Sequence, residues 1–131
     1  MDSAALVNGF DAEAGREAVE AFDRAHLKVN AALWLYLSES QVWRLVIAAP
    51  LYDSGGPKEA YTRVSEILTE ASLSERLPLS RISIVSPQHP LISLFRGNLK
   101  VPGIGGVRFM RNVLNGTLIE DAYIYRMDPG A

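Results

Sequence analysis

Apolar residues recur at helical spacing in three stretches of the chain. Between residues 11 and 29 they recur every three or four positions among charged residues, which predicts an amphipathic helix. Pro57 suits the first turn of a second helix, because proline has no amide hydrogen to leave unbonded there. The apolar stripe of this second helix is Ala60, Tyr61, Val64, Ile67, Leu68 and Ala71. A brief third helix follows Pro90 and ends at Gly97.

Runs rich in Trp, Tyr, Val and Ile predict strands. Residues 31–37 and 42–49 are two such runs separated by four residues, which indicates a hairpin in which Leu37 faces Val42. Both faces of this hairpin are apolar, so we expect it in the centre of a sheet or against a partner. Residues 81–85 predict a further short strand.

Asn115-Gly116 predicts a second hairpin, because a type I′ turn needs positive φ at both central positions. Pairing residue 114 with residue 117 sets Arg111 opposite Glu120, on one nearly apolar face. The other members of that face are Val107, Phe109, Val113, Leu118, Ala122 and Ile124. We expect Arg111 and Glu120 to form an ion pair of about 0.2–1 kcal/mol, at an edge of the sheet.

The predicted order α-β-β-α-β-α-β-β indicates an α+β fold with one mixed sheet of about five strands and helices packed on it. An antiparallel meander with helices on one face is the alternative. No linker or repeat divides the chain, so we expect a single domain over residues 1–131. Residues 1–10 are an N-terminal segment and residues 127–131 a C-terminal tail.

Composition excludes several classes of function. The chain has 131 residues and no cysteine, so thiol catalysis, Cys-ligated zinc and iron–sulfur clusters are excluded. Two histidines make a metal site improbable, and no motif implies a cofactor. With no long apolar run and no basic, apolar leader, we expect a cytoplasmic protein that does not enter a membrane.

Charge is unevenly distributed along the chain. Residues 1–75 carry twelve acids and six bases, whereas residues 76–119 carry six bases and no acid. Such asymmetry is typical of contact with nucleic acid or another anion. Alternatively, the basic segment folds against the acidic helices and its charge is cancelled internally.

Two loops are predicted to meet if the second and third strands are parallel neighbours. A right-handed crossover would bring residues 52–57 and 86–90 to the same end of the sheet, beside two helix N-termini that favour an anion. The candidates there are Asp53, Ser54, Ser86, Gln88 and His89. His89 is the better acid–base candidate, because His26 falls on the apolar stripe of the first helix. Asp53, Ser54 and Ser86 are also ordinary cap and turn residues.

Residues 97–106 form a glycine-rich segment between basic residues. The candidate ligand-binding residues are Arg96, Lys100, Gly105, Gly106 and Arg108, since glycines let a backbone approach phosphate closely. The spacing matches neither a Walker loop nor a dinucleotide fingerprint, and a flexible entry to the last hairpin is the simpler interpretation. A helix from about residue 87 to residue 96 would hold Arg96 and His89 at opposite ends, so the two candidate sites do not merge.

The aromatic residues Trp34, Tyr36 and Trp43 lie side by side on the first hairpin. They are either a base-stacking surface or a buried or dimer-facing cluster.

Two functions follow from these patterns. The leading hypothesis is a non-catalytic binding module that contacts nucleic acid or a nucleotide through residues 76–119, with self-association as a homodimer as an accompanying expectation. The alternative is an enzyme acting on a small phosphorylated or carboxylated substrate, with His89 as acid or base and Asp53 or Ser54 to orient it.

Overall fold

Residues 9–128 are described by the structure, a computed structural model. The helices are α2 (Ala12–Arg24), α3 (Leu51–Glu70) and α4 (Pro90–Arg96), with a 3₁₀ turn at Leu79–Arg81. The strands are β1 (Ala31–Leu37), β2 (Val42–Ala48), β3 (Ile82–Val85), β4 (Val107–Leu114) and β5 (Thr117–Met127). The predicted α+β class and the order of elements are confirmed.

The five strands form one mixed sheet in the order β3-β2-β1-β5-β4. β2 and β3 are parallel, and the other neighbours are antiparallel. The alternative meander is therefore wrong. The first hairpin occupies the centre of the sheet, as its two apolar faces predicted, and Leu37 pairs with Val42.

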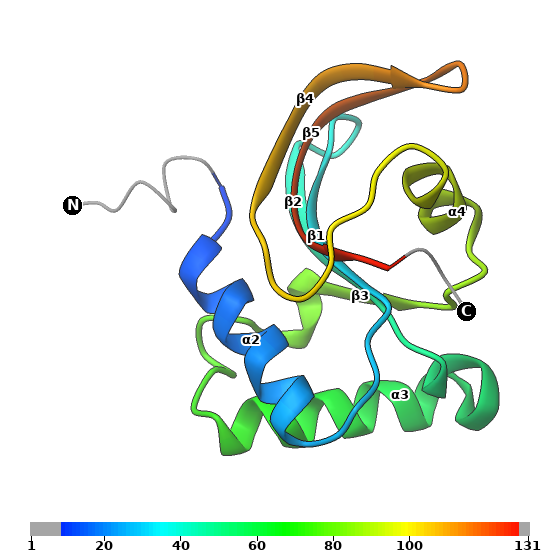
Figure 1. Ribbon diagram of the computed structural model, residues 1–131. Coiled ribbons are helices and arrows are strands. Elements are labelled where there is room, and N and C mark those ends of the chain that lie inside the picture. Colours follow the sequence, from blue (N-terminus) through cyan, green and yellow to red (C-terminus); the bar gives the residue numbers. More distant parts are fainter. Residues whose placement is uncertain (1–8, 129–131) are drawn as a thin grey trace.

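Helices cover both faces of the sheet (Figure 1). α2 and α3 bury one face through a core that includes Phe22, Trp34 and Leu68. α4 buries the opposite face through a second core, in which Ile92 and Phe95 meet Leu33. The outer hairpin, β4 and β5, curls away from the rest of the sheet over α4 (Figure 1).

α2 is shorter than predicted. Asp11 caps its start by accepting a hydrogen bond from the amide of Ala14 at 2.9 Å. The helix ends at Arg24 rather than near Val29, because His26 adopts a left-handed conformation with φ 62°. Leu27 and Val29 are buried although they lie beyond the helix, so their spacing continued the apolar pattern of α2 without being helical.

The segment before Pro57, predicted as a loop, is helical. α3 begins at Leu51 and is interrupted at Gly56, whose φ of 86° is one that glycine adopts without strain. Pro57 starts the second part of the helix, as predicted.

An irregularity in β5 turns two neighbouring side chains toward α2. The register of β1 against β5 shifts between Ala32 and Leu33, which leaves Tyr125 as an extra residue in β5. The Tyr125 hydroxyl donates to the carbonyl of Ala12 at 2.6 Å. Arg126 binds the carboxylate of Asp23 at 2.7 and 3.0 Å. The last strand therefore holds the first helix at two points.

The outer hairpin has the predicted register but not the predicted face near its turn. Leu114 pairs with Thr117, yet Arg111 has φ 48°, which interrupts the alternation of side chains. Leu114 and Ile119 are buried there, whereas Val113 and Leu118 are each 62% exposed.

The predicted ion pair between Arg111 and Glu120 is wrong. Within residues 9–128 neither side chain has an ionic partner, because the left-handed turn at Arg111 removes the two residues from the regular ladder. Arg108 forms the ion pair of this hairpin instead, with Asp121 at 2.6 Å.

Candidate functional site

The carboxyl ends of β2 and β3 meet, as the crossover argument predicted. The amide of Ala49 donates to the carbonyl of Val85 at 3.2 Å. Beyond that contact, the hydroxyl of Ser86 donates to Asp53 at 2.9 Å. Sequence reasoning therefore brought these two loops together correctly.

The polar groups of this junction are occupied by local structure. The Ser86 hydroxyl accepts a hydrogen bond from the amide of Gln88, and Nδ1 of His89 accepts one from the amide of Leu91. Ser54 lies elsewhere, beside a depression that Ala25 and Pro50 also line. Because Ser86 and His89 act here as turn and cap residues, the geometry adds no catalytic pair. The enzymatic hypothesis stays a prediction.

Arg96 comes closer to the junction than its place at the end of α4 indicated. Its guanidinium folds back along the helix and donates to the carbonyl of Pro87. Arg96 and His89 lie at opposite ends of α4, but the Arg96 side chain still reaches the loop that precedes the helix. Its hydrogen bond to Pro87 holds that loop, so the guanidinium is engaged within the fold.

Most of the basic segment is engaged within the fold. Arg76 pairs with Asp11 and Glu17, and Arg81 donates to the carbonyls of Gly9 and Trp43. Arg96 and Arg108 are bound as described above. In the part of the chain that the structure describes, only Lys100 and Arg111 of the six bases lack such a partner. Internal cancellation, the second interpretation of the charge pattern, fits Arg76 and Arg108, which pair with carboxylates, whereas Arg81 and Arg96 bind uncharged carbonyl groups.

The glycine-rich segment packs against β5. The amide of Gly105 donates to the carbonyl of Tyr125 at 2.7 Å. A Cβ at Gly106 would lie 2.4 Å from the hydroxyl oxygen of Tyr123, so any larger residue there would displace the Tyr123 side chain. Neither residue is arranged around an open anion site.

The aromatic residues form a buried cluster. Phe10 lies over Trp43 and Trp34, with ring centroids 4.5 and 5.8 Å apart. Both tryptophans are buried, and the guanidinium of Arg108 covers Phe10 at 5.5 Å from its ring centroid. The two tryptophans therefore offer no open face for stacking bases, whereas Tyr36, which packs on Trp43 with ring centroids 5.4 Å apart, is only half-buried.

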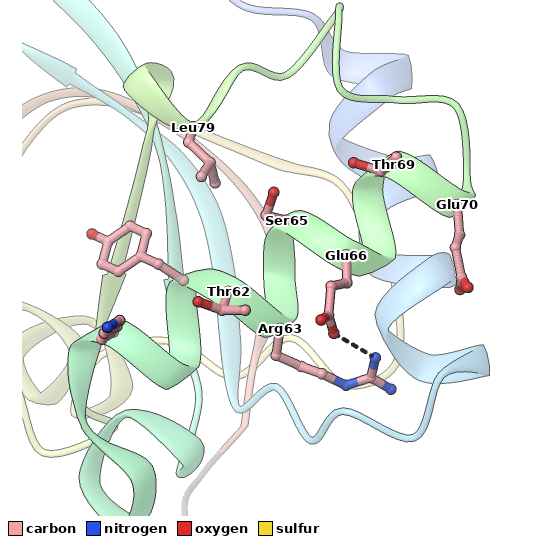
Figure 2. Close-up of a pocket in the computed structure, with 9 residues that line it drawn as sticks. Thr62, Arg63, Ser65, Glu66, Thr69, Glu70 and Leu79 are labelled. Atoms are coloured by element: carbon pink, nitrogen blue, oxygen red, sulfur yellow. Dashed lines mark ion pairs between the residues drawn. The ribbon is translucent and has the colours of Figure 1, made fainter.

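A broad depression lies along the outer surface of α3, beside the 3₁₀ turn (Figure 2). Its lining combines charged residues, such as Arg63 and Glu66, with short polar ones, such as Thr62, and with Leu79. Arg63 and Glu66 are paired at 3.6 Å within it. This surface brings together no group of reactive side chains.

The sheet splits between its two hairpins. Pairing of β1 with β5 ends at Leu35 and Ala122, although β1 continues to Leu37 and β5 begins at Thr117. Residues 117–121 therefore pair only with β4 and have a free backbone side. A strand with a free side can accept hydrogen bonds from another extended chain.

The split forms a groove of about 370 Å³, which we call the hairpin groove. It is lined by Leu35, Tyr36, Leu37, Ser38, Glu39, Ser40, Leu91, Thr117, Leu118, Ile119 and Glu120. Leu35 and Ile119 are buried, whereas Leu118 and its pair Val113 stand exposed beside the groove. Exposed apolar side chains next to a groove are typical of an interaction surface.

Sequence reasoning missed the hairpin groove entirely. Its walls come from two hairpins, and its position depends on where the ladder between β1 and β5 stops. The one available signal was the apolar character of both hairpins, which indicated more hydrophobic surface than one layer of helices covers.

Comparisons with known proteins give no relative. No family model matches the chain, and neither the curated proteins nor the solved structures include a significant match. Within residues 9–128, no helix is long and apolar enough to cross a membrane. The same residues include no group of three or more potential metal ligands.

Proposed function

We propose that this protein is a non-catalytic interaction module that takes up an extended segment of a partner protein in the hairpin groove. The observation that carries the proposal is the split between β1 and β5. It combines a free backbone side on residues 117–121 with an apolar floor. Extended peptides bind such edges through main-chain hydrogen bonds, and pockets beside the edge select side chains.

Leu118, which lines the hairpin groove, belongs to a set of strongly exposed apolar residues on the outer hairpin. Met110, Val113 and Leu118 are 53–62% exposed on one hairpin. A partner segment that covered Leu118 would remove apolar area from water, a gain of about 25 cal/mol per Å².

The outer edge of the sheet is a poorer place for a second copy of this chain. β4 carries Arg108 and Arg111 and no acid. Pairing of β4 with the same strand of a second copy would bring together two Arg111 guanidinium groups with no carboxylate on either strand to balance them, since Asp121 of β5 pairs with Arg108. The proposal therefore names a different protein as partner, and self-association is one outcome of its test.

The predicted anionic partner is not part of this proposal, because four of the six bases in residues 76–119 are engaged within the fold. Contact with an anionic partner stays a prediction. Oligonucleotide binding at low salt that falls steeply as salt is added would support it.

Selection of displayed 12-residue peptides on the intact protein tests the proposal. Selected peptides should bind wild type, and Leu118→Ser should weaken that binding by about fivefold or more because it removes an apolar contact. Leu79→Ser is the matched control, since Leu79 is exposed and lies on the distant 3₁₀ turn.

Peptides N-methylated at alternate residues should bind far more weakly, because they lack the main-chain donors for strand pairing. The proposal is overturned if no peptide binds, or if Leu79→Ser weakens binding and Leu118→Ser does not. Light scattering at tens of micromolar protein reports self-association separately, and a dimer that loses its affinity on Leu118→Ser would replace the partner protein with a second copy.

A further inference from the structure

The rim of the hairpin groove carries two carboxylates that the fold does not use. Glu39 lies in the turn between β1 and β2, and Glu120 lies in β5, so the two acids face the groove from different hairpins. Both are exposed. Neither forms an ion pair or a side-chain hydrogen bond with any residue from 9 to 128.

Among residues 9–128, no basic side chain lines the groove to balance these acids. Arg111 is the base that the hairpin register would have set opposite Glu120, but its left-handed conformation leaves the two unpaired. The rim of the groove is therefore acidic, with carboxylates contributed by two separate parts of the chain.

Below the rim the groove is apolar. Its floor includes the buried side chains of Leu35 and Ile119, with Leu91 contributed by α4. Ser38, Ser40 and Thr117 add hydroxyl groups that accept hydrogen bonds. Its volume falls in the range of about 300–1,000 Å³ that is usual for sites that bind small groups.

Resting on the proposed function, we infer that the partner segment places a lysine or arginine side chain in the hairpin groove. These two residues combine a long apolar stem with a cationic head, and the stem lies along apolar surface while the head stays near water. The stem would cover the leucines of the floor. The head would reach the carboxylates of Glu39 and Glu120 and the neighbouring hydroxyls.

Other occupants fit the groove less well. An apolar side chain would fill the floor but would leave both carboxylates without a partner, and an acidic one would be repelled by them. A divalent cation prefers six or more oxygen ligands and has no use for the apolar floor.

A thermodynamic cycle across the interface tests this inference. Peptides selected on the wild-type protein should be enriched in Lys or Arg at one position flanked by apolar residues. The affinity of one such peptide, and of its copy with Met at the basic position, is then measured for wild type and for the double variant Glu39→Gln/Glu120→Gln.

The double variant should bind the basic peptide about fivefold or more weakly than wild type and the Met peptide equally well. The difference should shrink as salt is added, because the charges at the rim are exposed. Glu59→Gln/Glu70→Gln is the matched control, since it removes two exposed acids from α3 and should leave both affinities unchanged.

The outcomes separate the two claims. One outcome is that peptides bind and Leu118→Ser weakens their binding, but the cycle shows no coupling between the basic residue of the peptide and Glu39 and Glu120. In that case the inferred lysine or arginine is wrong and the proposed function stands. If no peptide is selected, or if Leu118→Ser leaves the peptide affinity unchanged, the proposed function is overturned and this inference with it.

Discussion

Removing the Tyr125 hydroxyl is expected to destabilise the fold strongly for so small a change. In the wild-type structure that oxygen accepts a hydrogen bond from Nε1 of Trp34 at 3.1 Å and donates to the carbonyl of Ala12 at 2.6 Å. Tyr125 and Trp34 are each 1% exposed. Tyr125→Phe therefore leaves the indole N–H buried without a partner and cuts the link from β5 to α2.

The two losses can be estimated separately. An orphaned buried donor costs about 1–3 kcal/mol, and a lost hydrogen bond to a partly buried carbonyl about 0.5–1.5 kcal/mol. Together they predict a loss of about 2–4 kcal/mol. With a urea slope of about 2 kcal/mol per molar, the middle of the range for small proteins, the unfolding midpoint should fall by about 1–2 M.

Tyr123→Phe is the matched control on the same strand. Its hydroxyl forms no hydrogen bond with residues 9–128, so removing it should change stability by less than about 0.5 kcal/mol. Urea unfolding followed by tryptophan fluorescence compares the two variants. Equal costs for both would refute the role assigned to the Tyr125 hydroxyl.

Three further predictions concern the same end of α2. Burial raises the pKa of Tyr125, so its contribution to stability should be lost as pH rises above about 10, and a pH series of unfolding should show this loss in wild type but not in Tyr125→Phe. Partial burial acts to raise the pKa of Asp11, but hydrogen bonds from Arg76 and the helix amides outweigh it and hold the pKa below 3.8. Asp11→Ala should therefore cost about 1 kcal/mol at pH 7, and the difference from wild type should shrink as pH falls below about 4; a constant difference would contradict the capping role. Gly15→Ala should destabilise by about 1–3 kcal/mol despite the higher helix propensity of alanine, because the new Cβ would lie 2.2 Å from the Tyr125 hydroxyl oxygen; a gain in thermal stability would show that the contact relaxes freely.

Much of the fold could be predicted because its signals are local. The apolar runs of β1 and β2 set the first hairpin and its register, and Asn115-Gly116 set the second. The meeting of Asp53 and Ser86 was predicted on the condition that β2 and β3 are parallel neighbours, and the structure meets that condition.

What could not be predicted depends on conformations that carry no local signal. Arginine rarely adopts a positive φ, so nothing in the sequence announced the left-handed turn at Arg111 that exchanges the faces of the outer hairpin. His26 also has a positive φ that the sequence did not predict, and it ends α2 earlier than the apolar pattern indicated. The hairpin groove joins Glu39 to Glu120 only because pairing of β1 with β5 stops at Leu35, which is a property of the whole sheet.

Amide chemical-shift mapping is the most direct test of the proposed interaction module. The ¹⁵N-labelled wild-type protein would be titrated with a selected peptide until the signals stop changing. If the account is right, the largest changes fall on residues 35–40 and 117–121, the two walls of the hairpin groove, with smaller changes at Val113. Changes concentrated instead at residues 52–57 and 86–90, or spread over the bases of residues 76–100, would contradict it.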